Sequence, residues 1–177
     1  MIRLLAISGS LRAESSNKAL LEAAGMLAPQ GMEIILYPSV GDLPHYNPDM
    51  ERALPPAVQD FRAQVRAADG LLISSPEYAH GVPGSLKNAL DWLVGGDEFI
   101  AKPVALFNAS PRATHAQAAL AETLKTMSGR VLSESSIALP LLAKKMVAAA
   151  IVAEPEMAAA LRKALTAFAS ALRQTPA

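Results

Sequence analysis

The 177-residue sequence contains no cysteine. Disulfides, thiol catalysis, cysteine-ligated zinc and iron–sulfur clusters are therefore excluded. Its three histidines, His45, His80 and His115, are too few and too far apart in the sequence to indicate a metal site. We expect no bound metal.

The sequence also lacks an excess of either charge. Lysine and arginine together number 16, and so do aspartate and glutamate, so the formal net charge is zero. Binding to the phosphates of nucleic acid needs a basic surface. The balance therefore argues against nucleic acid as the main partner, although it leaves room for a local basic pocket.

Long apolar runs are missing as well. The longest apolar stretch, residues 146–153, is far shorter than the roughly 20 residues of a membrane-spanning helix. The apolar run that follows Met1 is shorter than that of a secretory signal peptide. We therefore expect a cytoplasmic protein with no membrane partner. The length and the 51% hydrophobic content predict a single domain, residues 1–177, with a sizeable core.

What the sequence does contain is an alternation of apolar runs and helical patterns. Strands are predicted at residues 3–8, 32–37, 70–75, 103–109 and 130–139, and helices at 17–28, 56–68, 84–94, 115–127 and 156–173. Such alternation predicts an α/β fold with right-handed crossovers. Five strands favour a flavodoxin-like three-layer α/β/α sandwich with a parallel sheet in the order 2-1-3-4-5. Residues 140–155 are either a partial helix in a subunit interface or part of the core.

Ligands bind to such sheets at the carboxyl ends of the strands, beside the point where the strand order reverses. With the order 2-1-3-4-5, this point lies between the first and third strands. Three loops should therefore converge on one crevice: residues 9–16, 76–83 and 109–114.

The first of these loops, SGSLRAESSN at residues 8–17, has neither a Walker pattern nor G-x-G-x-x-G. It offers hydroxyl, guanidinium and amide donors before and at the start of a predicted helix: Ser8, Ser10, Arg12, Ser15, Ser16 and Asn17. Donors at a helix N-terminus suit a phosphate monoester. The alternative is that Ser16 or Asn17 merely caps the helix and Arg12 is solvated.

The loop after the third strand reads SPEYAHGVPG, residues 75–84. Its prolines stiffen the backbone, and Gly81 and Gly84 allow a positive φ or a close backbone approach. Such a loop suits a flat heteroaromatic ligand, with Tyr78 as a stacking face. Alternatively, His80 is a solvated loop residue, Tyr78 covers the core and Glu77 is a surface acid.

These two loops together resemble the NADPH-dependent FMN reductase family, which includes quinone, chromate and azo-compound reductases. Its usual patterns are GSLR-x-x-S-x-N and PEY-N-x-x-x-PG-x-LKNA-x-DW. The first is matched at Gly9, Ser10, Leu11, Arg12, Ser15 and Asn17, and the second at Pro76, Glu77, Tyr78, Pro83, Gly84, Leu86, Lys87, Asn88, Ala89, Asp91 and Trp92. The resemblance covers about two-thirds of the chain.

The resemblance implies an FMN-dependent oxidoreductase that takes hydride from NADPH or NADH and reduces a quinone, free flavin or a similar small-molecule acceptor. It implies a phosphate site at Ser10, Arg12, Ser15 and Asn17, joined by Ser16. Pro76, Glu77, Tyr78, Ala79, His80 and Gly81 would face the flavin ring, and Ser110 in the loop 108–117 would border its other edge. The chemistry would belong to the flavin, with no catalytic side chain. Members usually form homodimers or homotetramers.

The chain departs from the family pattern in two places. Ala79 replaces the usual asparagine, and the loop 108–117 contains no glycine but carries Arg112 and His115. Arg112 would pair with the extra phosphate of NADPH or remain solvated. Two other functions stay open: a flavin-binding electron carrier or redox sensor without NAD(P)H oxidation, and a protein-interaction module that has lost its cofactor.

Overall fold

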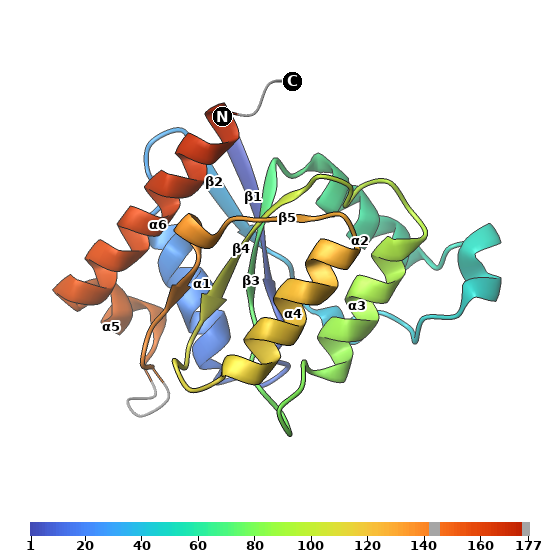
Figure 1. Cartoon of the computed structure of the whole chain (residues 1–177), viewed down its shortest axis with the longest axis horizontal. Helices are drawn as coiled ribbons and strands as arrows, with labels where there is room; N and C mark the ends of the chain where they lie inside the picture. Colours follow the sequence, from blue (N-terminus) through green and yellow to red (C-terminus); the bar gives the residue numbers. More distant parts are fainter. Residues whose placement is uncertain (142–145, 175–177) are drawn as a thin grey trace.

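A parallel β-sheet lies between two layers of helices in the computed structural model, which describes residues 1–141 and 146–174 (Figure 1). The strands are β1 (Ile2–Ser8), β2 (Met32–Leu36), β3 (Gly70–Ser74), β4 (Pro103–Asn108), β5 (Arg130–Val131) and β6 (Ile137–Ala138). Their order is β2-β1-β3-β4-β5, and β6 also pairs with β4. The predicted flavodoxin-like fold and strand order are confirmed.

The helices divide between the two faces of the sheet. They are α1 (Ser16–Met26), α2 (Pro56–Ala67), α3 (Gly84–Val94), α4 (Thr114–Thr126), α5 (Ala148–Ala153) and α6 (Pro155–Arg173). One core is formed with α1, α5 and α6, and the other with α2, α3 and α4 (Figure 1). Within the described ranges, no helix is both long and apolar enough to cross a membrane.

The central strands are apolar on both faces because each face packs against helices. In β1, Leu4 and Ala6 enter the core under α1 and α6, whereas Leu5 and Ile7 enter the core under α2 and α3. All four side chains are at most 3% exposed. This is why β1 reads as a continuous apolar run rather than an alternating one.

The fifth strand differs from the prediction. Residues 130–139 form not one strand but two short ones, β5 and β6, separated by a 3-10 turn at Ser133–Ser135 (η3). Both run parallel to β4. Across the interruption, the Ser136 hydroxyl accepts a hydrogen bond of 3.0 Å from the Leu106 N–H. The serine-rich sequence favours a turn here, and a side chain replaces the missing ladder bond.

The segment 140–155 is partly helical and partly core. Within it, α5 buries Ile151 in the core that it shares with α1 and α6. The alternative of a subunit interface is not tested by a single chain, and residues 142–145 lie outside the described residues. The helix that follows, α6, begins at Pro155, a residue type suited to the first turn.

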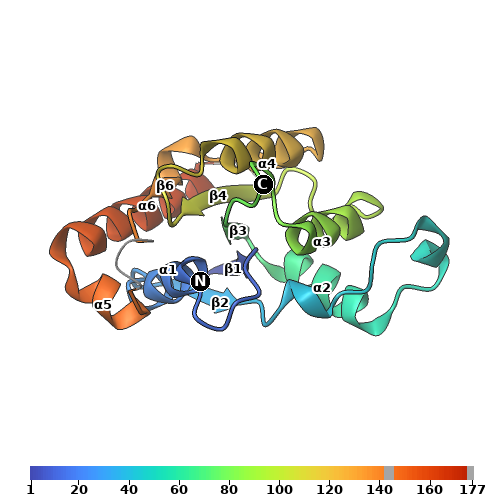
Figure 2. The same cartoon turned by 90° about the horizontal axis from the view of Figure 1, so that it is seen from below.

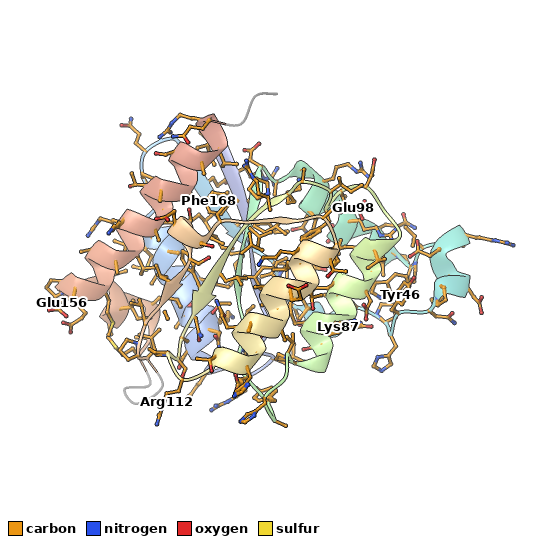
Figure 3. The ribbon with its side chains drawn as sticks, in the orientation of Figure 1. Tyr46, Lys87, Glu98, Arg112, Glu156 and Phe168 are labelled. Atoms are coloured by element: carbon orange, nitrogen blue, oxygen red, sulfur yellow. The ribbon has the colours of Figure 1, made fainter. Side chains whose placement is uncertain are left out.

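The chain between β2 and α2 projects beside α2 and α3 and carries two 3-10 turns, Val40–Asp42 (η1) and Pro48–Arg52 (η2) (Figures 1 and 2). Helix α3 anchors it: the Asn88 amide and the Trp92 indole N–H both donate to the Pro44 carbonyl, at 2.9 and 2.7 Å. Tyr46 packs edge-on against the Trp92 ring (Figure 3 labels Tyr46). Two residues of the family-like pattern after β3 therefore have a structural role.

Candidate functional site

A cavity of about 370 Å³ opens at the carboxyl ends of the strands. Its walls come from the three loops expected to converge: β1–α1, β3–α3 and β4–α4. The lining residues are Ser10, Arg12, Ser15, Ser16, Asn17, Ser75, Pro76, Glu77, Tyr78, Asn108, Ala109, Ser110, Arg112 and Ala113. Figure 2 views the molecule from the side on which these loops lie. The size is within the usual range for small-molecule sites.

The β1–α1 loop leaves the sheet through a tight passage. Gly9 donates its N–H to the Ser74 carbonyl at 2.8 Å. A Cβ at this position would lie 2.9 Å from the Ser75 hydroxyl and 3.0 Å from Leu86. A side chain at residue 9 would therefore displace the Ser75 and Leu86 side chains, whereas glycine lets the loop pass close to them without this displacement.

Helix α1 presents its N-terminus to this loop. Ser15 is the N-cap, and its hydroxyl accepts a 3.3 Å hydrogen bond from the Lys18 N–H. Asn17 is buried, and its side-chain oxygen accepts from the Ser74 hydroxyl at 2.9 Å. The alternative that Ser16 or Asn17 caps the helix is therefore wrong. Among the described residues the Asn17 side-chain nitrogen has no partner, so it is available to a ligand in the cavity.

Arg12 lies at the exposed rim of the same loop. Its guanidinium forms no ion pair with any residue in the described part of the chain. A helix N-terminus, serine hydroxyls, an amide nitrogen and a guanidinium are thus gathered at one end of the cavity. The group that such donors suit best is a phosphate.

The β3–α3 loop is a tight hairpin. Tyr78 and Gly81 exchange two backbone hydrogen bonds, at 3.1 and 2.8 Å. The two residues between them have positive φ, 48° at Ala79 and 61° at His80, as in a type I′ turn. Neither Gly81 nor Gly84 has a positive φ, so of the two uses that these glycines allow, the structure does not take this one. The strained positions are the two that carry side chains.

This hairpin holds Tyr78 at the cavity rim and ties the loop to α4. Tyr78 is 54% exposed, so the alternative that it covers the core is wrong. The Glu77 carboxylate accepts a 2.8 Å hydrogen bond from the Ala116 N–H, and it is therefore a helix-capping group rather than a free surface acid. The rings of His80 and His115 stack with centroids 4.2 Å apart and an interplanar angle of 6°.

Asn108, at the end of β4, shapes the third loop. Its side-chain oxygen accepts from the Ser110 N–H at 2.9 Å, and its amide nitrogen donates to the Ala113 carbonyl at 3.2 Å. These bonds bring Ser110 to the cavity wall without any glycine in the loop. Arg112 is exposed at the same edge of the molecule (Figure 3).

Comparison with models of protein families shows which family the sequence belongs to. A model of the family described as NADPH-dependent FMN reductase matches residues 2–141. The chain belongs to this family. The match includes all three loops of the cavity, so the resemblance of the two sequence patterns is confirmed.

Individual relatives agree with the family. An NAD(P)H-dependent FMN reductase of Pseudomonas aeruginosa is 47% identical over 112 residues, which cover 62% of this chain and 60% of that protein. A quinone reductase of Escherichia coli is 40% identical over 94 residues, 52% of this chain and 50% of the relative. This chain thus spans between half and three-fifths of the length of these two relatives.

A solved structure extends the similarity over nearly the whole chain. FerB of Paracoccus denitrificans, described as a flavoenzyme NAD(P)H:(acceptor) oxidoreductase, superimposes with a TM-score of 0.83 and 28% sequence identity. The superposition covers 98% of each chain. It therefore includes α5 and α6, which follow the region matched by the family model.

Nine of the twelve predicted site residues line the cavity, namely Ser10, Arg12, Ser15, Ser16, Asn17, Pro76, Glu77, Tyr78 and Ser110. Ala79, His80 and Gly81 do not line the cavity; they form the hairpin turn that follows Tyr78 in the chain. The prediction overlooked Ser75, Asn108, Ala109 and Ala113 as lining residues. The signal for Asn108 was present, because a lone polar residue ends the apolar strand β4.

The residues present fit FMN, the cofactor in the family's name. The Asn17 nitrogen, which has no partner within the described ranges, the serine hydroxyls and the Arg12 guanidinium suit its phosphate. The opposite walls, from Pro76 to Tyr78 and from Asn108 to Ser110, provide apolar surface and backbone polar groups for a flat ring. The described residues contain no cluster of three or more His, Asp or Glu side chains that could hold a metal ion.

The geometry of residue 79 makes a prediction about the missing asparagine. A non-glycine residue in the left-handed region is strained, and asparagine tolerates it better than alanine. We expect Ala79→Asn to raise the free energy of unfolding by about 0.5–1 kcal/mol. Urea denaturation measures this. Ala53→Asn, at an exposed position with φ of −147°, is the matched control and should change little. Equal effects of the two substitutions would contradict the strain.

Proposed function

We propose that this protein is an FMN-dependent NAD(P)H oxidoreductase whose cofactor occupies the cavity between the three loops. The carrying observation is that the donors suited to a phosphate gather at one end of this cavity and the loop walls suited to a flat ring lie opposite. Family membership and the likeness to the FerB flavoenzyme support the proposal. Residues 1–177 would form one FMN-binding domain.

The chemistry that FMN supplies when bound is two-electron transfer from NADPH or NADH to an acceptor. The role of the chain's own residues is to bind and orient the cofactor. Ser10, Arg12, Ser15, Ser16 and Asn17 hold the phosphate by hydrogen bonds and charge. Glu77 and Asn108 fix the two loops that face the ring by bonding to backbone groups. No side-chain nucleophile is required.

The acceptor proposed is a small molecule, a quinone or free flavin. Relatives named quinone reductase and FMN reductase support these two classes. We propose a cytoplasmic homodimer or homotetramer, as is usual in the family, with no nucleic-acid or membrane partner. Light scattering of the purified protein measures the oligomer, and a monomer at micromolar concentration would contradict that part.

A titration and a reduction experiment test the function. FMN added to the purified protein should bind with quenched fluorescence, and NADPH or NADH should then bleach the bound flavin without air. Riboflavin, which lacks the phosphate, is the control ligand and should bind at least about tenfold more weakly if charge-assisted bonds hold the phosphate.

Three outcomes would contradict parts of this assignment. A protein that takes up no FMN contradicts the cofactor. Equal affinities for FMN and riboflavin contradict the phosphate site. Bound flavin that stays oxidised with both NADPH and NADH contradicts the reductase activity and favours an electron carrier or sensor.

A further inference from the structure

Two contacts join the β3–α3 loop to the first turn of α4. The Glu77 carboxylate accepts from the Ala116 N–H at 2.8 Å, and the His80 ring stacks on the His115 ring at 4.2 Å. The partners are adjacent in sequence on the α4 side. Together they bridge two of the three walls of the cavity, and we refer to the stacked pair His80–His115 as the clasp.

The clasp holds a turn that is otherwise strained. Ala79 and His80 both have positive φ, a conformation that only surrounding contacts stabilise in residues with side chains. Tyr78 immediately precedes this turn and lines the cavity. Stacking of His80 on His115 therefore fixes the turn, and the turn fixes Tyr78 at the rim.

We propose that His80 and His115 are positioning residues that hold the Tyr78 loop in its ligand-ready form, and that protonation of both rings releases it. Both imidazoles are exposed and form no ion pair with an acid among the described residues. Histidine changes charge between about pH 5 and 8. Two cationic rings at this separation repel each other. The link to FMN rests on the proposed function; the stacking itself does not.

The charged groups around the clasp offset a double positive charge only in part. Glu77 on the same loop supplies one negative charge, held against the α4 backbone. Arg112, just before α4, and Arg12, on the facing loop, add positive charge. On α3, Lys87 pairs with Asp91 at 2.6 Å. Tyr78 is the remaining titratable group of the loop, and its phenol hydroxyl adds no positive charge.

Proton NMR of the imidazoles tests the clasp in the protein without ligand. The chain has only three histidines, so single substitutions assign every resonance. Stacking should displace the His80 ring protons upfield, and His115→Ala should return them to ordinary positions. His115→Phe, which keeps a ring, should leave them displaced. His45 is the internal control. Identical His80 resonances in the wild type and His115→Ala would overturn the clasp.

FMN affinity tests the positioning role. His115→Ala should weaken FMN binding by about 2- to 10-fold, the equivalent of one aromatic pair, whereas His115→Phe should restore it to within about twofold. His45→Phe should change nothing. The positioning role would be overturned if His115→Ala and His115→Phe weakened FMN binding equally, or if neither weakened it. A wild type that binds no FMN contradicts the proposed function instead, and the NMR result still decides on the clasp.

The pH dependence of FMN affinity tests whether protonation of the two rings releases the Tyr78 loop. Between about pH 8 and 5.5 the wild type should lose more FMN affinity than the His80→Phe/His115→Phe double variant, whose stack cannot charge. Comparing the two proteins at each pH removes the titration of the ligand's own phosphate. Parallel pH profiles would overturn the release on protonation.

Discussion

Arg12→Ala should weaken FMN binding by about 10- to 150-fold, which corresponds to about 1.5–3 kcal/mol for a hydrogen bond to a charged group. The guanidinium lies at the cavity rim, and within the described residues it has no acidic partner. Removing it therefore takes away a ligand contact without leaving a protein charge unpaired. Fluorescence titration with FMN measures the effect, and Tm should stay close to that of the wild type.

Two controls separate this contact from a general effect of charge. Arg3→Ala makes the same change in net charge on an exposed residue near the start of β1, at the end of the sheet opposite the loops, and should leave FMN affinity unchanged. Riboflavin binding should be nearly equal in wild type and Arg12→Ala, because the lost partner is the phosphate. Unchanged FMN affinity in Arg12→Ala would mean that the phosphate lies elsewhere.

Glu98→Gln should lower the free energy of unfolding by about 3 kcal/mol, the cost of breaking a buried ion pair. The Glu98 side chain is only 1% exposed and contacts Arg62 at 3.2 Å and Arg66 at 3.1 Å. Arg62 is itself 12% exposed. It keeps Glu51 at 2.8 Å and the Trp92 carbonyl at 2.6 Å, which places the loss at the lower end of the usual range.

Thermal unfolding measures this loss as a fall in Tm of about 6–12 °C. Asp97→Asn is the control: Asp97 is the neighbouring residue and also pairs with Arg66, at 2.6 Å, but both side chains are exposed. The hydrogen bond from Arg66 lowers the pKa of Asp97, yet water screens the pair, so Tm should change little. A Tm unchanged by Glu98→Gln would show that the buried pair contributes no net stability.

The same variant separates stability from function. Glu98 lies at the edge of the molecule opposite to Arg112 and the cavity (Figure 3). Below the melting temperature, Glu98→Gln should bind FMN as the wild type does. The two largest predicted effects are therefore independent: one removes a ligand contact and leaves the fold intact, and the other weakens the fold and leaves the site intact.

The sequence predicted the sheet because its strongest signals are local. Strands such as β1 and β3 are continuous apolar runs, since helices cover both of their faces. Helices α2, α3 and α4 begin within one residue of their predicted starts. The prediction failed at residues 130–139, where a turn replaces the middle of the strand. There the Ser136 side chain, rather than the backbone, completes the hydrogen bonding of β4.

At the site, the sequence alone determined which residues could serve a phosphate and where the loops would meet. The residue types themselves show which side chains can donate hydrogen bonds to a phosphate. The loops meet because the carboxyl ends of parallel strands lie at one edge of the sheet. The tertiary structure alone decided what these residues do for one another. Glu77 caps α4, Asn17 holds Ser74, and the clasp joins two loops, because each of these contacts pairs residues far apart in the chain. Positive φ at Ala79 likewise follows from closure of the hairpin, because alanine itself has no preference for this conformation.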